Sequence, residues 1–244
     1  MVLSLYTLTI WRNNIMKLSN ETVAVLKNFS TINQNLVIKA GSKLSTMSAM
    51  KNIVASADVK EVFPQDFAIY DLNEFLAAIS LFDTVDLDFK NDFVVITEDG
   101  NPQRSLQYWY SDPSVVTHPK TDITMPDPDV QFQFASSTLS EVQKAASIIG
   151  APDMVLEGMS KGNAIIKVTD KKNATANDFK VGLPVDETTK DVPYKFWFKV
   201  ENLKLIPGSY EVNVSSKKIS YFSNTKVPVR YFIALEPESS YPNE

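Results

Sequence analysis

Two pairs of aspartates have a spacing that would let their carboxylates share a divalent cation. Asp86 and Asp88 alternate along a predicted strand and so lie on one face of it, whereas Asp127 and Asp129 flank a proline. Oxygen ligands of this kind suit Mg²⁺ or Ca²⁺, but neither pair has an evident third ligand. We therefore expect solvated carboxylates at both places and no metal site.

The residues that usually perform covalent catalysis are scarce. The chain contains no cysteine and one histidine, His118, which precedes a proline and belongs to no recognisable nucleophile motif. Its seven glycines are spread out and form no phosphate-binding loop. A hydrolase would need a nucleophile and a base that the sequence does not offer. We therefore expect no catalytic residue and no cofactor, and a protein that is not an enzyme.

Lysines on the polar faces of predicted helices indicate a different kind of chemistry. The net charge is −5, from 24 basic and 29 acidic residues, which does not indicate a nucleic-acid binder but permits a local basic face. Short cationic and amide side chains suit contacts to phosphate without base readout. Each candidate taken alone is equally typical of the solvated face of a surface helix. The candidates are Lys17, Lys27, Asn28, Lys51, Lys144, Lys199 and Lys204.

The first of these helices is predicted over residues 18–32, where Ser19 or Asn20 can cap the N-terminus. Apolar residues then recur at helical spacing through Ile32. The pattern returns over residues 138–148, so that Thr22 matches Thr138 at an offset of 116 residues. A repeat of half the chain predicts two similar domains.

The remaining elements follow the same order in both halves. Each half continues with strands of period two, a second helix and further strands. In the first half the strands are predicted at 36–38, 53–57, 66–70, 85–89, 93–96 and 104–110, with a turn at Gly41, a helix over 71–81 and a hairpin turn at 90–92. In the second half they are predicted at 130–134, 154–156, 164–168, 178–183, 194–198, 210–214, 219–222 and 229–235, with a short helix over 200–205.

The segments between and beyond these halves complete the expected domain organisation. Residues 111–129 carry four prolines and read as an extended connector between a domain over 16–110 and a domain over 130–238. Residues 1–15 are apolar but too short to span a bilayer, and we expect them to be an extension outside the fold. Both Met1 and Met16 remain possible chain starts. The polar residues from Pro237 onward, and 239–244 in particular, are expected to form a frayed tail.

Several strings in this order resemble one known family. Met16-Lys-Leu-Ser, Leu26-Lys-Asn-Phe-Ser-Thr-Ile-Asn, Ala68-Ile-Tyr-Asp-Leu-Asn, Trp109 with Asp112-Pro-Ser-Val-Val, and Ile233-Ala-Leu-Glu are similar to the polymerase sliding clamp of T4-type bacteriophages. The resemblance runs from Met16 to about Glu238 and is diffuse over 151–193. It implies an α+β DNA-clamp fold, with two similar domains whose helices pack on antiparallel sheets, assembled as a ring.

The resemblance also implies a function and partners. A clamp is a homotrimer that encircles duplex DNA without sequence preference, tethers the replicative DNA polymerase, and is loaded by an ATP-driven clamp loader in the cytoplasm of the infected bacterial host. It would not contact a membrane. A structural β-rich ring protein of a phage virion is the alternative, and it would not need cationic helix faces turned towards one axis.

Two further sites follow from the resemblance. The expected subunit interface pairs the last strand of the first half with a strand of the neighbouring copy, through Leu106, Tyr108, Trp109 and Tyr110 against Phe179, Val181 and Leu183. Alternate residues of these strands must instead belong to the core. The expected pocket for partner peptides lies under the connector and is lined by Leu44, Met47, Val115, Val116, Ile123, Leu235 and Pro237.

Overall fold

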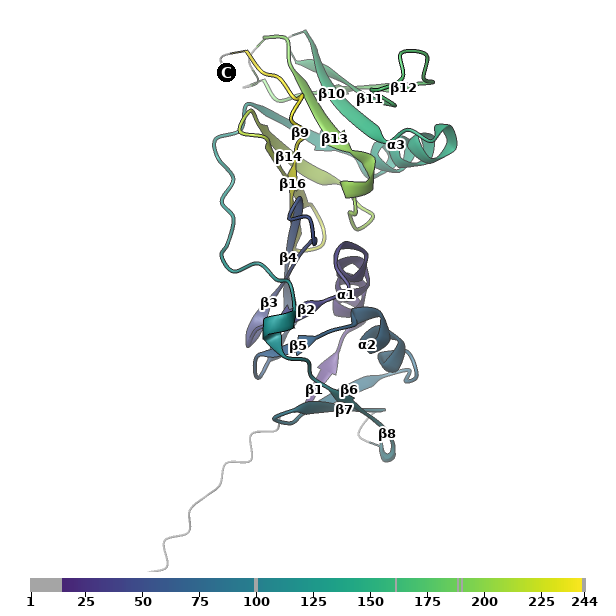
Figure 1. The fold of residues 1–244 in the computed structure, drawn as a ribbon, viewed down its shortest axis with the longest axis vertical. Helices are drawn as coiled ribbons and strands as arrows, with labels where there is room; N and C mark the ends of the chain where they lie inside the picture. Colours follow the sequence, from purple (N-terminus) through teal and green to yellow (C-terminus); the bar gives the residue numbers. More distant parts are fainter. Residues whose placement is uncertain (1–14, 99–100, 161, 188, 190, 243–244) are drawn as a thin grey trace, which may run out of the picture.

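The computed structural model describes residues 15–98, 101–160, 162–187, 189 and 191–242. Two halves, each made of sheets and helices, are stacked along the long axis of the molecule, and residues 111–129, the connector, run along one side from the first half to the second (Figure 1). The α-helices lie on the opposite side (Figure 1). They are α1 (Asn20–Ile32), α2 (Leu72–Ile79) and α3 (Ser136–Ile149).

The described residues of the first half form eight antiparallel strands. They are β1 (Ile15–Leu18), β2 (Leu36–Ile38), β3 (Gly41–Met47), β4 (Ile53–Phe63), β5 (Phe67–Ile69), β6 (Val85–Phe89), β7 (Phe93–Glu98) and β8 (Asn101–Trp109). One sheet has the order β1-β6-β7-β8, and β2 pairs with β5. Residues 90–92 form the hairpin turn between β6 and β7, as expected.

The second half repeats this plan. Its strands are β9 (Val130–Phe134), β10 (Asp153–Ser160), β11 (Asn163–Thr169), β12 (Phe179–Pro184), β13 (Lys195–Lys199), β14 (Tyr210–Ser215), β15 (Ile219–Asn224) and β16 (Val229–Ala234). The order β9-β14-β15-β16 repeats β1-β6-β7-β8, because in each case the strand before the long helix pairs with the first strand of a meander. Likewise β10, β11 and β12 follow α3 as β2, β3 and β4 follow α1, so the repeat seen in the sequence extends to the topology.

The two halves share one sheet. Strand β4 pairs with β16 in antiparallel register, from Ile53 opposite Ile233 to Ala57 opposite Val229, which produces a six-stranded sheet of order β3-β4-β16-β15-β14-β9. We call this pairing the internal joint. In the repeat, β4 corresponds to β12 and β16 corresponds to β8.

The start of α1 is held by a buried carboxylate as well as by its cap. The Ser19 hydroxyl accepts a hydrogen bond from the Thr22 N–H (3.2 Å), as the sequence predicts for an N-cap. The Ser19 N–H and the Thr22 hydroxyl donate to the two oxygens of Glu61 on β4, at 2.6 and 2.5 Å. Burial acts to raise the pKa of the Glu61 carboxyl, but these hydrogen bonds outweigh it and hold the pKa below its ordinary value.

The prediction of a fourth helix over residues 200–205 is wrong in its length. Only a single 3₁₀ turn, η2 (Val200–Asn202), forms. Lys199, at the N-cap position, makes no capping hydrogen bond, whereas Asp71 caps α2 by accepting from the Asn73 and Glu74 N–H groups. Pro207 follows closely and cannot supply a backbone N–H to extend a helix.

The ends of the chain also differ from expectation. Residues 1–14 of the predicted extension lie outside the described residues, but Ile15 belongs to β1, opposite Asp88 of β6. The described part of the C-terminal tail is packed rather than frayed. Tyr241 is buried and its ring stacks on Phe196, with centroids 6.0 Å apart, and the backbone of Ser240 bonds that of Lys195.

Candidate functional site

The polar faces of α1 and α3 carry two lysines whose side chains remain available to a ligand. Lys27 and Lys144 are exposed, and neither ammonium forms an ion pair or a hydrogen bond within the described residues. Both helices lie on the side of the molecule away from the connector (Figure 1). Ala24 and Thr31, which lie one turn from Lys27 on the exposed face of α1, are small and do not obstruct it. This face can meet a polyanion over a broad surface.

Two other predicted members of this face hold the halves together instead. The Asn28 amide donates to the Lys204 carbonyl (2.9 Å), and the Asn28 side-chain oxygen accepts from the Tyr231 hydroxyl (2.8 Å). The Lys204 ammonium donates to the Thr31 carbonyl (2.6 Å), in the last turn of α1, where a cation is favoured by the helix dipole. We call these four residues the polar seam. The polar groups of Asn28 and Lys204 are thus engaged inside the chain, and their contact with a ligand stays a prediction.

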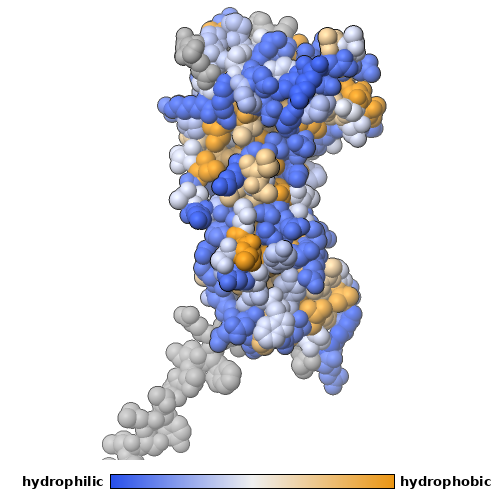
Figure 2. All heavy atoms as spheres, viewed as in Figure 1, coloured by the Kyte–Doolittle hydropathy of each residue, from blue (hydrophilic) through white to orange (hydrophobic). Residues whose placement is uncertain are grey.

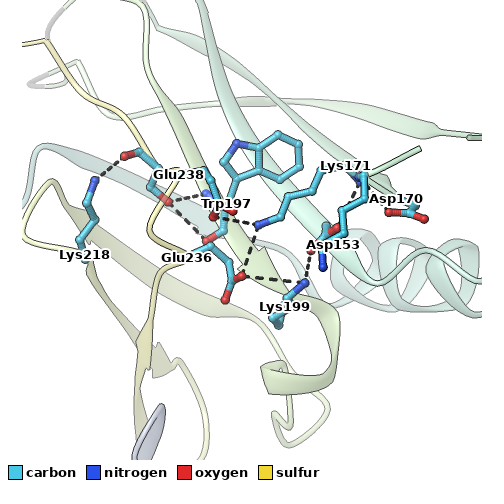
Figure 3. Close-up of polar contacts among 10 residues, drawn as sticks. Asp153, Asp170, Lys171, Trp197, Lys199, Lys218, Glu236 and Glu238 are labelled. Atoms are coloured by element: carbon cyan, nitrogen blue, oxygen red, sulfur yellow. Dashed lines mark hydrogen bonds and ion pairs between the residues drawn. The ribbon is translucent and has the colours of Figure 1, made fainter. Parts of the chain in front are cut away.

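Lys199 also forms ion pairs within the chain. Its ammonium lies 2.6 Å from a carboxylate oxygen of Asp153, which is 1% exposed, and 3.8 Å from Glu236 (Figure 3). Lys171 continues the cluster by pairing with Glu236 (3.3 Å) and Glu238 (3.0 Å), and its ammonium lies 5.6 Å from the centre of the Trp197 ring. A contact of Lys199 with a ligand stays a prediction, and moving this cation to a ligand would leave a buried carboxylate unpaired.

The remaining cations lie in strands and turns. Lys17 is exposed on β1 and already has an interaction partner, and Lys51 is exposed in the β3–β4 turn at a positive φ of 58°. Sequence reasoning missed Lys226, which follows β15 and lines a groove of about 360 Å³ beside Ala24 of α1. A search limited to helical spacing could not detect a turn lysine that packing brings beside α1.

Among the edge strands of the sheets, β8 and β12 lie at opposite ends of the molecule, and neither pairs with a second described strand (Figure 1). Strand β8 is the edge of one sheet and β12 the edge of another. Trp109, on β8, is 62% exposed although its ring packs on Phe93 of β7 at 5.1 Å. An unpaired edge that ends in an exposed tryptophan is a template for association with another strand.

The alternate residues of these edges pack inward. Tyr108 contacts the Phe75 ring and its hydroxyl donates to the Asp71 carbonyl (3.2 Å), and burial followed by the nearby Glu74 and Asp71 carboxylates raises the pKa of Tyr108 to about 12. Tyr110 packs on Phe67. Leu106, Phe179, Val181 and Leu183 are likewise packed against the core of their own half. Of the seven residues predicted for the interface, Trp109 alone is largely exposed.

The connector covers a pocket, but with other lining residues than predicted. Leu44 is fully buried in the core, Leu235 is buried, and Val116 packs on Val37 and Ala68 of the small β2–β5 sheet. Met47, Val115 and Pro237 do not line the pocket either. The pocket, of about 440 Å³, contains Ile123 and Met125 of the connector, with Val54, Tyr221 and Phe232 from the outer face of the six-stranded sheet. Leu44 lies outside the pocket because β3 turns its side chain towards the core.

Comparisons with known proteins identify this arrangement. The chain is 35% identical to the sliding clamp of Vibrio phage KVP40, over 91% of this chain and 99% of that protein. This chain belongs to the sliding clamp family. It is also 30% identical to the sliding clamp of Enterobacteria phage T4, over 93% of this chain and 99% of that protein, and residues 18–104 match the family model described as DNA polymerase processivity factor.

The fold of this clamp has relatives at much lower sequence identity. A chain of the PCNA2–PCNA3 complex from Sulfolobus tokodaii superposes with a TM-score of 0.68 at 10% identity, over 91% of this chain and 99% of that one. The DNA-clamp fold expected from the sequence is thus confirmed.

The residues considered for metal binding and catalysis can be located in the described part of this clamp. No group of three or more His, Cys, Asp or Glu residues there is arranged to hold a metal ion. Asp129 accepts a hydrogen bond from the Ser216 N–H (2.8 Å), and a ring nitrogen of His118 lies 3.1 Å from the Val116 carbonyl. No described helix has the length and apolar character required to cross a membrane.

Proposed function

We propose that this clamp closes head to tail as a homotrimer around duplex DNA and tethers the replicative DNA polymerase. The observation that carries the proposal is the placement of two free edges, β8 and β12, at opposite ends of one chain whose helices share a side (Figure 1). Head-to-tail contacts between unlike patches close into a ring when the rotation permits. Such a ring would place α1, α2 and α3 of every copy around the hole.

We propose further that contacts with DNA are made to phosphate alone. Lys27 and Lys144 have no internal partner within the described residues, so three copies present 3 × 2 = 6 lysines to the duplex, and Lys226 adds one more per copy. Phosphate contacts carry no sequence information and weaken as salt rises. The net charge of −5 keeps the equilibrium affinity low, so that residence on DNA depends on encirclement.

The pocket under the connector is our candidate for docking the polymerase and an ATP-driven clamp loader. Its apolar floor, which includes Tyr221 and Phe232, suits the anchor side chain of a short peptide. Ion pairs flank it, since Lys43 lies 2.7 Å from Asp122 of the connector and Arg230 pairs with Asp58. This clamp would then act as a scaffold rather than a catalyst, in the cytoplasm of an infected bacterium.

Retention on DNA tests the encirclement. Protein loaded by a clamp loader should stay on closed circular DNA and leave linear DNA by sliding off its ends. Exchanging both Lys27 and Lys144 for Ala should reduce loading and its dependence on salt while leaving the mass of the trimer unchanged. Lys217→Ala, in the exposed turn between β14 and β15, is the matched control. Equal loss from circular and linear DNA would refute the proposal and favour the structural virion ring.

A pair of connector variants tests the docking pocket. Ile123 lines the pocket, whereas the exposed Val115 lies on the connector outside it. Ile123→Glu should abolish most of the stimulation of the polymerase, because a carboxylate would have to be buried under a peptide anchor. Val115→Glu should leave stimulation intact. Equal effects of the two variants would remove this pocket from the docking site.

A further inference from the structure

We infer that the pocket under the connector continues across the second half of the clamp, and that it takes an extended partner peptide with a basic side chain a few residues from its apolar anchor. This inference rests on the docking function proposed above. It adds a second hollow beside the pocket, three side-chain amides that would bind the peptide backbone, and Glu211 as the acidic residue that would meet the basic side chain.

The outer face of the six-stranded sheet carries a row of side chains that runs straight across four strands. Phe232 of β16 lies opposite Tyr221 of β15. Tyr221 lies opposite Asn213 of β14, which in turn lies opposite Gln131 of β9. Directly opposite residues of an antiparallel pair point to the same face, with Cα atoms about 4.5–5.5 Å apart. The row therefore passes without a gap from aromatic to amide side chains.

Two hollows adjoin each other on this row. The pocket under the connector, of about 440 Å³, contains Phe232 and Tyr221, and a second hollow of about 430 Å³ contains Asn213 and Gln131. Because Tyr221 and Asn213 are direct neighbours, only one strand interval of about 5 Å separates the two hollows. Figure 2 shows hydrophobic residues among hydrophilic ones on the connector side of the second half. We call the two hollows together the cross-sheet groove.

The second hollow has the chemistry of a peptide-binding surface. It is lined by the side chains of Gln131, Gln133 and Asn213, and none of these three amides forms a hydrogen bond within the described residues. A side-chain amide offers both a donor and an acceptor, as each peptide unit of a backbone does. The amides can therefore bind an extended chain whatever its side chains are.

The edge of β9 is not available for the addition of another strand. The Asp186 N–H donates to the Gln131 carbonyl (2.7 Å), and the Gln131 N–H donates to the Thr189 hydroxyl (3.5 Å). The chain that follows β12 thus covers this edge, and Pro184 and Val185 form the far wall of the second hollow. A peptide here must lie over the face of β14 and β9, where side-chain amides meet it.

The connector leaves this direction open to a peptide. At one end, Lys43 of β3 pairs with Asp122 at 2.7 Å and ties the connector to the first half. At the other end, the Ser216 N–H donates to Asp129 at 2.8 Å and fixes the connector over the end of β14. Glu211 lies at the start of β14, away from this attachment. A peptide anchored over Phe232 can therefore leave the pocket across the middle of β14.

Glu211 supplies an uncompensated charge to the groove. It is exposed and forms no ion pair or hydrogen bond within the described residues. Lys43 and Arg230, which line the first hollow, are instead already paired with carboxylates. A basic side chain of the peptide would therefore find its complement at Glu211, in the second hollow.

The spacing of the strands sets the distance between the anchor and the basic residue. Neighbouring strands are about 4.8 Å apart, so β9 lies roughly 10 Å from β15. An extended peptide advances about 3.3 Å per residue and crosses that distance in about three residues. We therefore expect the basic residue about two to four positions from the apolar anchor.

Protection of an introduced cysteine tests whether the partner reaches β9, because the chain contains no cysteine of its own. Gln133 is exposed in the second hollow, whereas Lys217 is exposed in the turn between β14 and β15 outside it. Binding of the replicative polymerase should slow alkylation of the Gln133→Cys variant several-fold and leave the Lys217→Cys variant unchanged. Equal alkylation of Gln133→Cys with and without polymerase would overturn the inference.

Side-chain variants test the two kinds of contact. Glu211→Gln should raise the polymerase concentration needed for half-maximal stimulation by about two- to five-fold, and this effect should fade as salt rises. Gln131→Ala combined with Asn213→Ala should raise it by about three- to ten-fold. Glu187→Gln removes an exposed carboxylate that does not line the groove, and it should have no effect. The amount of clamp loaded on DNA is measured in every reaction, so that loading and stimulation are separated.

These experiments distinguish the groove from the pocket itself. If Ile123→Glu abolished stimulation while the Glu211 and amide variants matched the wild type, the pocket would stand and its continuation would be refuted. If Ile123→Glu had no effect, the proposed docking pocket would fail. Equal effects of Glu211→Gln and Glu187→Gln would refute the contact at Glu211, because they would show a response to bulk charge.

Discussion

Replacing Lys199 by Met should destabilise the second half of the clamp while leaving DNA contacts unchanged. The Lys199 ammonium is the nearest cation to Asp153, whose carboxylate is 1% exposed and otherwise accepts one backbone hydrogen bond, from the Lys171 N–H at 3.2 Å. Methionine preserves most of the side-chain volume and removes the charge. The buried carboxylate would then lose its main compensation.

The magnitude follows from the burial of the two partners. Removing one partner of a fully buried ion pair costs about 3–5 kcal/mol. The Lys199 side chain is 26% exposed, so water already screens part of this interaction, and we expect a loss of roughly 2–3 kcal/mol. For a chain of this length, that corresponds to a decrease in Tm of roughly 5–10 °C. Thermal unfolding followed by circular dichroism at a fixed protein concentration measures it.

Two controls make the result decisive. Lys144→Met removes an exposed lysine that has no internal partner within the described residues, so it should lower retention on circular DNA without changing the Tm. Adding Asp153→Asn to Lys199→Met should recover part of the lost stability, because the buried charge is gone. If Lys199→Met melted like the wild type and lost DNA retention, Lys199 would be a DNA contact and the reasoning would be refuted.

Three further variants test the packing of the fold. Glu61→Gln should cost about 2 kcal/mol in urea unfolding at pH 7; because the folded pKa of Glu61 is lowered, this stabilisation is complete above about pH 4.5 and the difference from wild type should shrink as the pH falls through the folded pKa. Gly158→Ala would place a Cβ 2.5 Å from the Tyr194 ring, so a loss of about 1–3 kcal/mol is expected in the same assay, and Tyr194→Leu in the same chain should relieve it. Tyr241→Ala removes the stack on Phe196 and should make the C-terminal segment the first site of limited proteolysis; unchanged cleavage would contradict the packed tail.

Local patterns in the sequence were reliable guides to the fold. The apolar stripes of α1 and α3 depend only on residues three or four positions apart. The positions of both helices, and their offset of 116 residues, could therefore be predicted from the sequence. The short 3₁₀ turn in place of the fourth predicted helix also has a local cause, because Pro207 follows two residues after the predicted end and prevents the helix from continuing. Strand β3 escaped prediction because most of its residues are polar and its two large apolar residues, Leu44 and Met47, are three positions apart and do not alternate.

The site residues were harder to predict because their partners are distant in the chain. Asp153 lies 46 residues before Lys199, and Lys204 lies 176 residues after Asn28, so no spacing rule relates them. The helical pattern around a lysine does not show whether its ammonium is solvated or paired with a buried carboxylate. Trp109, in contrast, is exposed at the end of a strand next to the connector, and its place at a subunit interface stays a prediction.

The connector makes the two kinds of joint respond differently to dilution. Within one chain, the connector and the polar seam keep β4 and β16 at a local concentration that does not change when the protein is diluted, and short linkers of this kind correspond to the millimolar range. The proposed pairing of β8 with β12 of another copy would have no such tether and would obey mass action. Dilution would therefore open the proposed ring between copies and leave every chain intact.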